Sequence, residues 1–205
     1  MNYKLIGKLP LETTEFFKKE ILERNAGKPF NWVHFDDYLN SKFMEIFEND
    51  ELKIKRHPQT GQYVQKAVVV DPTYGMRIHK DGYADKGALN IAMDCNPGDW
   101  VRWYDENFIN YYCVMNDIPI KKKSPKFFGD LSSRNTDIYE FDDVPFIQEV
   151  NTQVGDVYVV DTDVWHSFKC VGNKTRIILQ TKFEGDPTAD ELIESLSKKS
   201  FKNLL

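Results

Sequence analysis

Two amphipathic segments open the chain. The first, residues 12–25, has a single apolar stripe made of Phe16, Phe17, Ile21 and Leu22. Thr13 or Thr14 stands where a helix N-cap is expected. The second, residues 36–49, repeats the pattern with Leu39, Phe43, Ile46 and Phe47. Because each segment has only one apolar stripe, we expect two helices that pack on the outside of a sheet.

From about residue 62 the pattern changes to short β-rich runs separated by Pro, Gly, Asp and Asn. The runs are QYVQKAVVVDP, MRIHKDG, GALNIAMDC, DWVRWYDE, FIQEVN, GDVYVVD, WHSFKCV and TRIILQTKF. The polar stretch at residues 121–145 interrupts them and predicts an excursion between strands, of the kind that often forms a lid. The tail, residues 186–205, predicts a last amphipathic helix opened by Thr188.

Two helices followed by about eight short strands predict a mainly β (α+β) fold, a double-sheet jelly roll supported by helices on one face. The chain has 205 residues, of which 41% are hydrophobic, enough for one well-filled core. We therefore expect a single domain over 1–205. Residues 1–60 would form the helical support, 62–184 the jelly-roll core and 186–205 the C-terminal helix.

Charge and cysteine content narrow the class of partner. The net charge of −5 is spread along the chain, whereas a nucleic-acid binder normally carries a basic face, so no nucleic acid is expected. No run of 18 apolar residues and no apolar signal region are present, which predicts a cytoplasmic protein without a membrane span. Three widely spaced cysteines indicate reduced thiols. A small-molecule or peptidyl substrate is the expected partner.

The run RIHKDG holds the first residues with clear chemistry. In an extended strand alternate side chains share a face, so His79 and Asp81 point the same way while Ile78 and Lys80 point the other. An imidazole and a carboxylate at this spacing can bind one metal from a single strand end. Gly82 follows at once, where a tight turn would open space beside them.

A second strand pair supplies the remaining groups. His166 ends one run, and Arg176 begins the next apolar run ten residues later. Two histidines and a carboxylate form a facial triad that leaves three positions open on an octahedral iron(II). Two of these can chelate a 2-oxo acid and the third is left for oxygen. The far carboxylate of the 2-oxo acid then needs a buried cation, and a guanidinium binds it through two hydrogen bonds.

These residues carry a resemblance. With His79, Asp81, His166 and Arg176 in this order, residues 62–184 resemble the double-stranded β-helix oxygenases that depend on iron(II) and 2-oxoglutarate. The segments IHKDG, ALNIAM and WVRWYD resemble the small aspartyl/asparaginyl or prolyl hydroxylases within that superfamily. The resemblance implies Fe(II), 2-oxoglutarate and O2 as cofactors and co-substrates. It also implies a dioxygenase reaction that hydroxylates the substrate and releases succinate and CO2.

Further site residues are weaker expectations. Asn90 and Tyr104 lie on the strands after the first ligand pair, where either could hydrogen-bond a 2-oxoglutarate carboxylate from inside the barrel. Four residues are expected to contact substrate: Arg77, Arg102, Trp103 and Arg134. For Arg77 the favoured alternative is a surface salt bridge at the strand start.

Two other functions stay open. Cupin-type metal-binding isomerases share the jelly roll but often use three histidines and a glutamate, and no extra histidine clusters with these. A non-catalytic jelly-roll binding protein would keep the fold without the activity.

Overall fold

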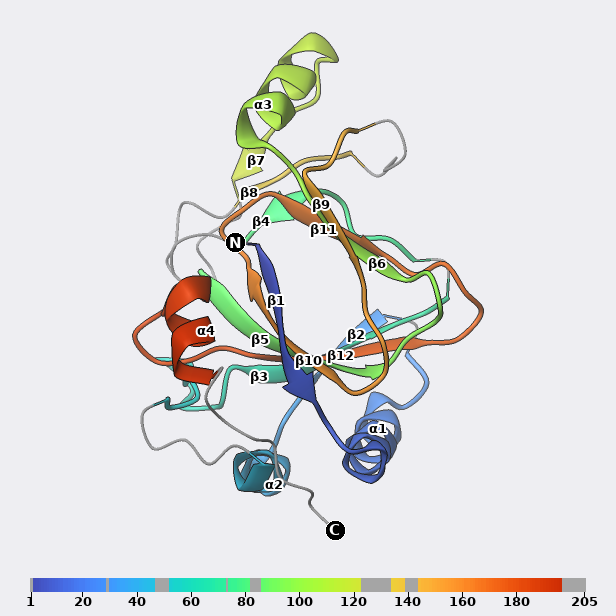
Figure 1. Ribbon diagram of the computed structural model, residues 1–205, viewed down its shortest axis with the longest axis vertical. Helices are drawn as coiled ribbons and strands as arrows, with labels where there is room; N and C mark the ends of the chain where they lie inside the picture. The colour runs from blue at the N-terminus through green and yellow to red at the C-terminus, as the bar shows by residue number, and fades with distance from the viewer. Residues whose placement is uncertain are drawn as a thin grey trace.

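The computed structural model describes residues 2–28, 30–46, 52–72, 74–81, 86–122, 134–138 and 144–196. Helices and strands follow one another along this part of the chain (Figure 1) as β1 (Tyr3–Lys8), α1 (Leu11–Asn25), β2 (Phe30–His34), α2 (Asp37–Ile46), β3 (Gln65–Val70), β4 (His79–Lys80), β5 (Gly87–Asp94), β6 (Trp100–Trp103), α3 (Glu106–Met115), β7 (Lys121–Lys122), β8 (Arg134–Asn135), β9 (Gln148–Asn151), β10 (Asp156–Asp161), β11 (His166–Lys169), β12 (Arg176–Thr181) and α4 (Ala189–Leu196).

The strands form two antiparallel sheets. The first has the order β1-β10-β5-β12-β3-β2 and the second the order β7-β8-β4-β11-β6-β9. Every strand pair in both sheets is antiparallel. This arrangement confirms the expected mixture of antiparallel sheets and supporting helices.

Strand β12 shows how the sequence divides the first sheet into two faces. Ile177 and Leu179 belong to a core that also contains buried residues of α1, α2 and α4, whereas Ile178 belongs to a different cluster between the sheets. Because side chains alternate along a strand, Arg176 and Gln180 lie on the same inward face as Ile178. The helices therefore cover the outer face (Figure 1), and the inner face is left for a site.

Two smaller clusters pack against the second sheet. The inner one joins the sheets and contains Trp103, Tyr158 and Ile178. The other lies under α3, which projects away from the sheets (Figure 1), and contains Ile78, Tyr104, Ile109, Cys113, Trp165 and their neighbours. Residues 103 and 104 thus belong to different clusters on opposite faces of the same sheet.

The predicted helices are present, with corrections at their ends. Pro10 occupies the N-cap position of helix α1 without a side-chain cap, and Thr13 and Thr14 lie buried inside the first turns of the helix. The Thr14 hydroxyl donates to the Pro10 carbonyl, so the threonines are not the N-cap. Leu22 is 42% exposed instead of buried, because the helix turns its Thr13–Phe17–Ile21 face to the sheet. Phe47 lies outside the described residues.

A tail helix is present as α4, and residues 197–205 of its predicted span lie outside the described residues. The Thr188 backbone N–H donates to Glu191 Oε2 at 2.7 Å, and the Glu191 N–H donates back to the Thr188 hydroxyl at 3.3 Å. This reciprocal pair is a capping box, and α4 begins at the next residue.

Five elements were not predicted: β1, β2, α3, β7 and β8. The third is the most informative, because the run DWVRWYDE was expected to be strand throughout. The strand ends at Trp103, and the Asp105 side chain then accepts from the Phe108 N–H at 2.9 Å and caps α3. An N-cap aspartate followed by buried Ile109 and Cys113 at helical spacing was the available signal.

Of the stretch 121–145, the structure describes residues 121–122, 134–138 and 144–145, among which are β7 and β8. A lid role for this stretch stays a prediction. Among the described residues, no helix has the length and apolar character needed to cross a bilayer.

Candidate metal centre

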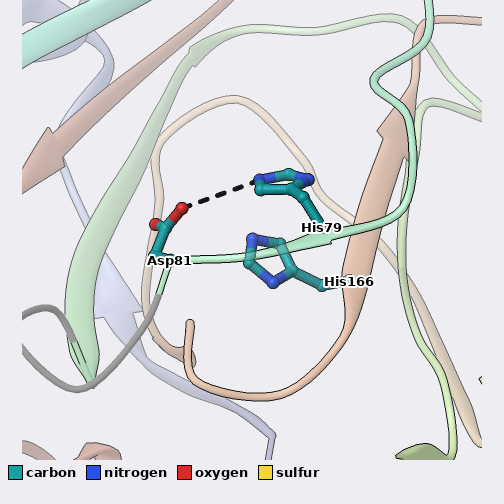
Figure 2. A group of neighbouring side chains, drawn as sticks. All are labelled: His79, Asp81 and His166. Atoms are coloured by element: carbon teal, nitrogen blue, oxygen red, sulfur yellow. Dashed lines mark ion pairs between the residues drawn. The ribbon is translucent and has the colours of Figure 1, made fainter. Parts of the chain in front are cut away.

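Strands β4 and β11 bring three ligand side chains together (Figure 2). His79 and His166 are direct cross-strand partners, and their ring centroids lie 4.2 Å apart. Asp81 comes one residue after the end of β4, and its Oδ1 lies 3.8 Å from His79 Nε2. Ligand atoms of all three residues lie within 4.8 Å of one another. A single metal ion can bind all three.

The backbone fixes which nitrogen each histidine presents. Nδ1 of His79 lies 2.9 Å from the Arg77 carbonyl oxygen, and Nδ1 of His166 lies 2.8 Å from the Val164 carbonyl oxygen. A carbonyl oxygen only accepts, so each Nδ1 carries the hydrogen. The lone pair of each neutral ring is then on Nε2, which is the form that binds a metal.

The third ligand is held at its main chain. The Asp81 N–H donates to the Thr162 carbonyl at 2.8 Å, in the turn that leads from β10 towards β11. This bond ties the end of β4 to the segment that precedes His166. Asp81 and both histidines are therefore fixed by one antiparallel pairing.

Arg176 lies inside the protein on the same side as the triad. It is 3% exposed, and its guanidinium carbon lies 4.7 Å from the centre of the Phe168 ring. Phe168 follows His166 by two residues, so the two share a face of β11 about 7 Å apart. The guanidinium therefore lies beside the face of β11 that carries His166.

Buried polar atoms around Arg176 call for a ligand. Among the described residues, Arg176 Nε, the Tyr158 hydroxyl and Asn90 Oδ1 are buried without a hydrogen-bond partner. Such atoms are rare in folded proteins unless a bound molecule satisfies them. The Arg176 Nε–H and the Tyr158 hydroxyl can donate to an anionic group with several acceptor oxygens, such as a carboxylate, whereas Asn90 Oδ1 can only accept.

Two comparisons by sequence find no match: no family model fits the chain, and no curated protein is similar enough to report. The comparison with solved structures does find matches. The chain is similar in fold to HygX.

HygX from Streptomyces hygroscopicus, in a crystal structure with iron bound, superposes with a TM-score of 0.52 at 9% identity, over 88% of this chain and 80% of HygX. Its structure with nickel and 2-oxoglutarate bound gives 0.51 at 8% identity. AviO1 from Streptomyces viridochromogenes Tue57 gives 0.50 at 10% identity, over 91% of both chains. At these identities the likeness shows the fold alone, and it agrees with the expected mixture of antiparallel sheets and helices.

Asn90 lies on the inner face of β5, at the same parity as Ala88 and Ala92 of the inner cluster. It is the cross-strand partner of Tyr158 on β10 and of Gln180 on β12. Tyr158 was not predicted, because DVYVVD has the composition of a plain core strand. Burial raises the pKa of its hydroxyl, and the nearby Arg176 opposes this increase. Inward parity beside Asn90 was the signal that could have found it.

Tyr104 lies elsewhere. Its hydroxyl is hydrogen-bonded to the Ser167 hydroxyl at 2.8 Å, within the cluster under α3. Ser167 follows His166 and therefore points to the opposite face of β11. The structure thus separates Tyr104 from Asn90 and Arg176.

The four expected substrate residues are placed differently from one another. Trp103 is the cross-strand partner of His166, so it shares the triad's face, and it is fully buried. Arg102 pairs with Ser167 on the opposite face, where it binds Glu149 at 2.6 Å. Of Arg102 and Trp103, the structure therefore places only Trp103 on the triad's side.

The other two arginines make ion pairs away from the triad's ligand atoms. Arg77 Nη1 lies 3.1 Å from Asp137 Oδ1, which is the surface salt bridge weighed as its alternative. Arg134 Nη1 lies 3.9 Å from Glu106 Oε1 at the start of α3. Both side chains are 38% exposed.

Proposed function

We propose that the protein is an Fe(II)- and 2-oxoglutarate-dependent dioxygenase. It hydroxylates an unactivated C–H bond of an amino acid, a peptidyl side chain or a small metabolite. One oxygen atom of O2 enters the substrate and the other enters succinate, with release of CO2. The observation that carries the proposal is the pairing of the His79–Asp81–His166 cluster with a buried arginine whose Nε has no partner.

Each residue has a defined part in this proposal. His79 and His166 present Nε2, and Asp81 presents Oδ1, to one Fe(II). When bound, the iron supplies the redox chemistry that couples oxidative decarboxylation of 2-oxoglutarate to substrate hydroxylation. Arg176 binds the far carboxylate of 2-oxoglutarate through its planar fork of N–H groups.

The interior of the two sheets supports the chemistry by excluding water. Trp103, Tyr158 and Ile178 close the space beside the triad and Arg176, and each is at most 4% exposed. Ionic contacts in such a dry space are stronger than in water. Tyr158 and Asn90 would complete the co-substrate site, and Trp103 would line the substrate side. We extend the proposal to a single jelly-roll domain whose two sheets form the halves of a double-stranded β-helix.

The two alternatives fit the site less well. Within the described residues, no further histidine or glutamate joins the triad, whereas cupins often use four protein ligands. A non-catalytic binding protein would need neither a facial triad nor a buried cation such as Arg176. HygX, which shares the fold, has been crystallised with 2-oxoglutarate and a metal.

Succinate release tests the proposal. The purified protein is supplied with Fe(II), 2-oxoglutarate, O2 and a panel of amino acids and peptides, and succinate is measured. We expect succinate from the wild type and from His34→Ala, whose histidine is exposed on β2, but not from His166→Ala. Equal succinate from His166→Ala and the wild type, or none from any variant, would contradict the proposal.

A further inference from the structure

The two carboxylate oxygens of Asp81 face different partners. Oδ1 lies 3.8 Å from His79 Nε2 and points into the triad. Oδ2 lies 3.6 Å from the ammonium nitrogen of Lys182. The carboxylate is therefore shared between a metal-facing side and a cation on its other side.

Lys182 is an unusual residue to find at this place. It is 4% exposed, and its Nζ donates to the Thr162 hydroxyl at 3.0 Å. Burying an ammonium group is costly unless it is paired and hydrogen-bonded. The Thr162 hydroxyl and the Asp81 carboxylate are these partners, and they hold the ammonium next to Asp81 inside the protein.

Thr162 connects the two residues. Its carbonyl accepts from the Asp81 N–H at 2.8 Å, while its hydroxyl accepts from Lys182. The main chain and the side chain of Asp81 are thus both positioned by the same residue. Lys182 directly follows β12, the strand that begins with Arg176. The two cations of the site therefore lie at opposite ends of this strand.

We propose that Lys182 is a positioning residue that restricts Asp81 to binding the metal through Oδ1 alone. This inference rests on the proposed function. A carboxylate that binds through both oxygens fills one more coordination position than a carboxylate that binds through one. With Oδ2 held by the ammonium, three positions stay open, two for the 2-oxo acid and one for oxygen.

The test uses Co(II), whose visible absorption reports the coordination of the ion, in the anaerobic full-length protein. Lys182→Met removes the charge and keeps the length of the side chain, and Lys182→Arg restores a cation. Lys18→Met is the matched control, because Lys18 forms a 2.8 Å ion pair with Asp94, a different aspartate. We expect Lys182→Met to change the Co(II) spectrum before any co-substrate is added. We also expect it to weaken 2-oxoglutarate binding by at least tenfold.

Lys182→Arg should recover most of the co-substrate affinity, and Lys18→Met should match the wild type in both measurements. An unchanged Co(II) spectrum in Lys182→Met would overturn the positioning role, even if 2-oxoglutarate bound more weakly, because Lys182 would then be a direct ligand of the co-substrate. If Lys182→Met does not fold, Thr162→Val removes the hydroxyl that holds the lysine and should shift the spectrum in the same direction. A wild-type Co(II) protein that binds no 2-oxoglutarate would contradict the proposed function and still leave the Co(II) spectra to test Lys182.

Discussion

His79 and His166 are direct partners across β4 and β11, and the same kind of hydrogen bond orients both rings. In each case Nδ1 is hydrogen-bonded to the carbonyl two residues earlier in the chain, that of Arg77 or Val164. The backbone therefore sets the direction of both Nε2 atoms before any metal binds. Such preorganisation lowers the cost of assembling a metal site.

Replacing Arg176 by lysine keeps the positive charge but removes the planar fork that binds a carboxylate through two hydrogen bonds. We expect Arg176→Lys to raise the KM for 2-oxoglutarate at least tenfold without weakening metal binding. Steady-state kinetics with varied 2-oxoglutarate checks this. The control is Arg56→Lys, since Arg56 also stacks on an aromatic ring but is exposed. An unchanged KM in Arg176→Lys would show that the co-substrate binds elsewhere.

Removing the hydroxyl from each of the two buried tyrosines should change a different property: stability for Tyr104 and co-substrate affinity for Tyr158. Tyr104→Phe breaks the hydrogen bond to Ser167 and should lower the free energy of unfolding by about 1–2 kcal/mol, with the KM for 2-oxoglutarate unchanged. Tyr158→Phe should raise that KM, because its hydroxyl lies near Arg176 and beside Asn90 on the inner face of the sheet. Denaturant titration and kinetics measure the two effects. The assignment fails if Tyr104→Phe changes the KM and Tyr158→Phe does not.

These tyrosines also show how far the sequence predicts the site. Strand parity was enough to pair His79 with Asp81, and the step from His166 to Arg176 pointed to a cation on the next strand. Tyr104 was expected to point inwards because the strand was extended past its end at Trp103. A two-residue period says which side chains share a face, but it does not say which face is inward.

Lys182 illustrates a second limit. It lies one residue beyond β12 and contacts Asp81, about a hundred positions earlier in the sequence. Only the pairing of distant strands brings the two together, and no local pattern records that pairing. The mixture of antiparallel sheets and helices and the clustering of His79, Asp81 and His166 were therefore predictable, whereas the contact between Lys182 and Asp81 was not.

Asp36 should give the fold part of its stability against acid. Its Oδ1 accepts from the Leu39 N–H at 2.9 Å at the start of α2, which lowers the pKa of the carboxyl below its ordinary value of 3.8, with Arg24 acting in the same direction. The carboxyl therefore stabilises the fold above its unfolded pKa, and this contribution is lost as the pH falls through the lower folded value.

We expect Asp36→Ala to lower the free energy of unfolding at pH 7 by about 1 kcal/mol. The variant should also lose less stability than the wild type below about pH 4, because it has no such carboxyl to protonate. Urea titrations at several pH values measure both effects, with Asp37→Ala as the control for charge at the same helix end. Parallel acid curves for Asp36→Ala and the wild type would rule out this role.

The three thiols should be inert in the folded protein. Cys95, Cys113 and Cys170 are free and buried, and burial raises the pKa of all three thiols, that of Cys170 to about 12. Since the thiolate is the reactive form, we expect negligible alkylation by iodoacetamide at pH 8 until denaturant is added. Mass spectrometry of the labelled protein counts the modified cysteines. Rapid labelling of a cysteine in the native protein would contradict this account of the core.

In the proposed function, one Fe(II) is held by His79, Asp81 and His166, and 2-oxoglutarate binds both the iron and Arg176. Anaerobic addition of Fe(II) and then 2-oxoglutarate, followed by visible absorption, tests this binding. We expect a weak charge-transfer band from the iron-bound 2-oxo acid in the wild type, and no band in His166→Ala. Iron binding by the wild type without such a band at saturating 2-oxoglutarate would contradict it.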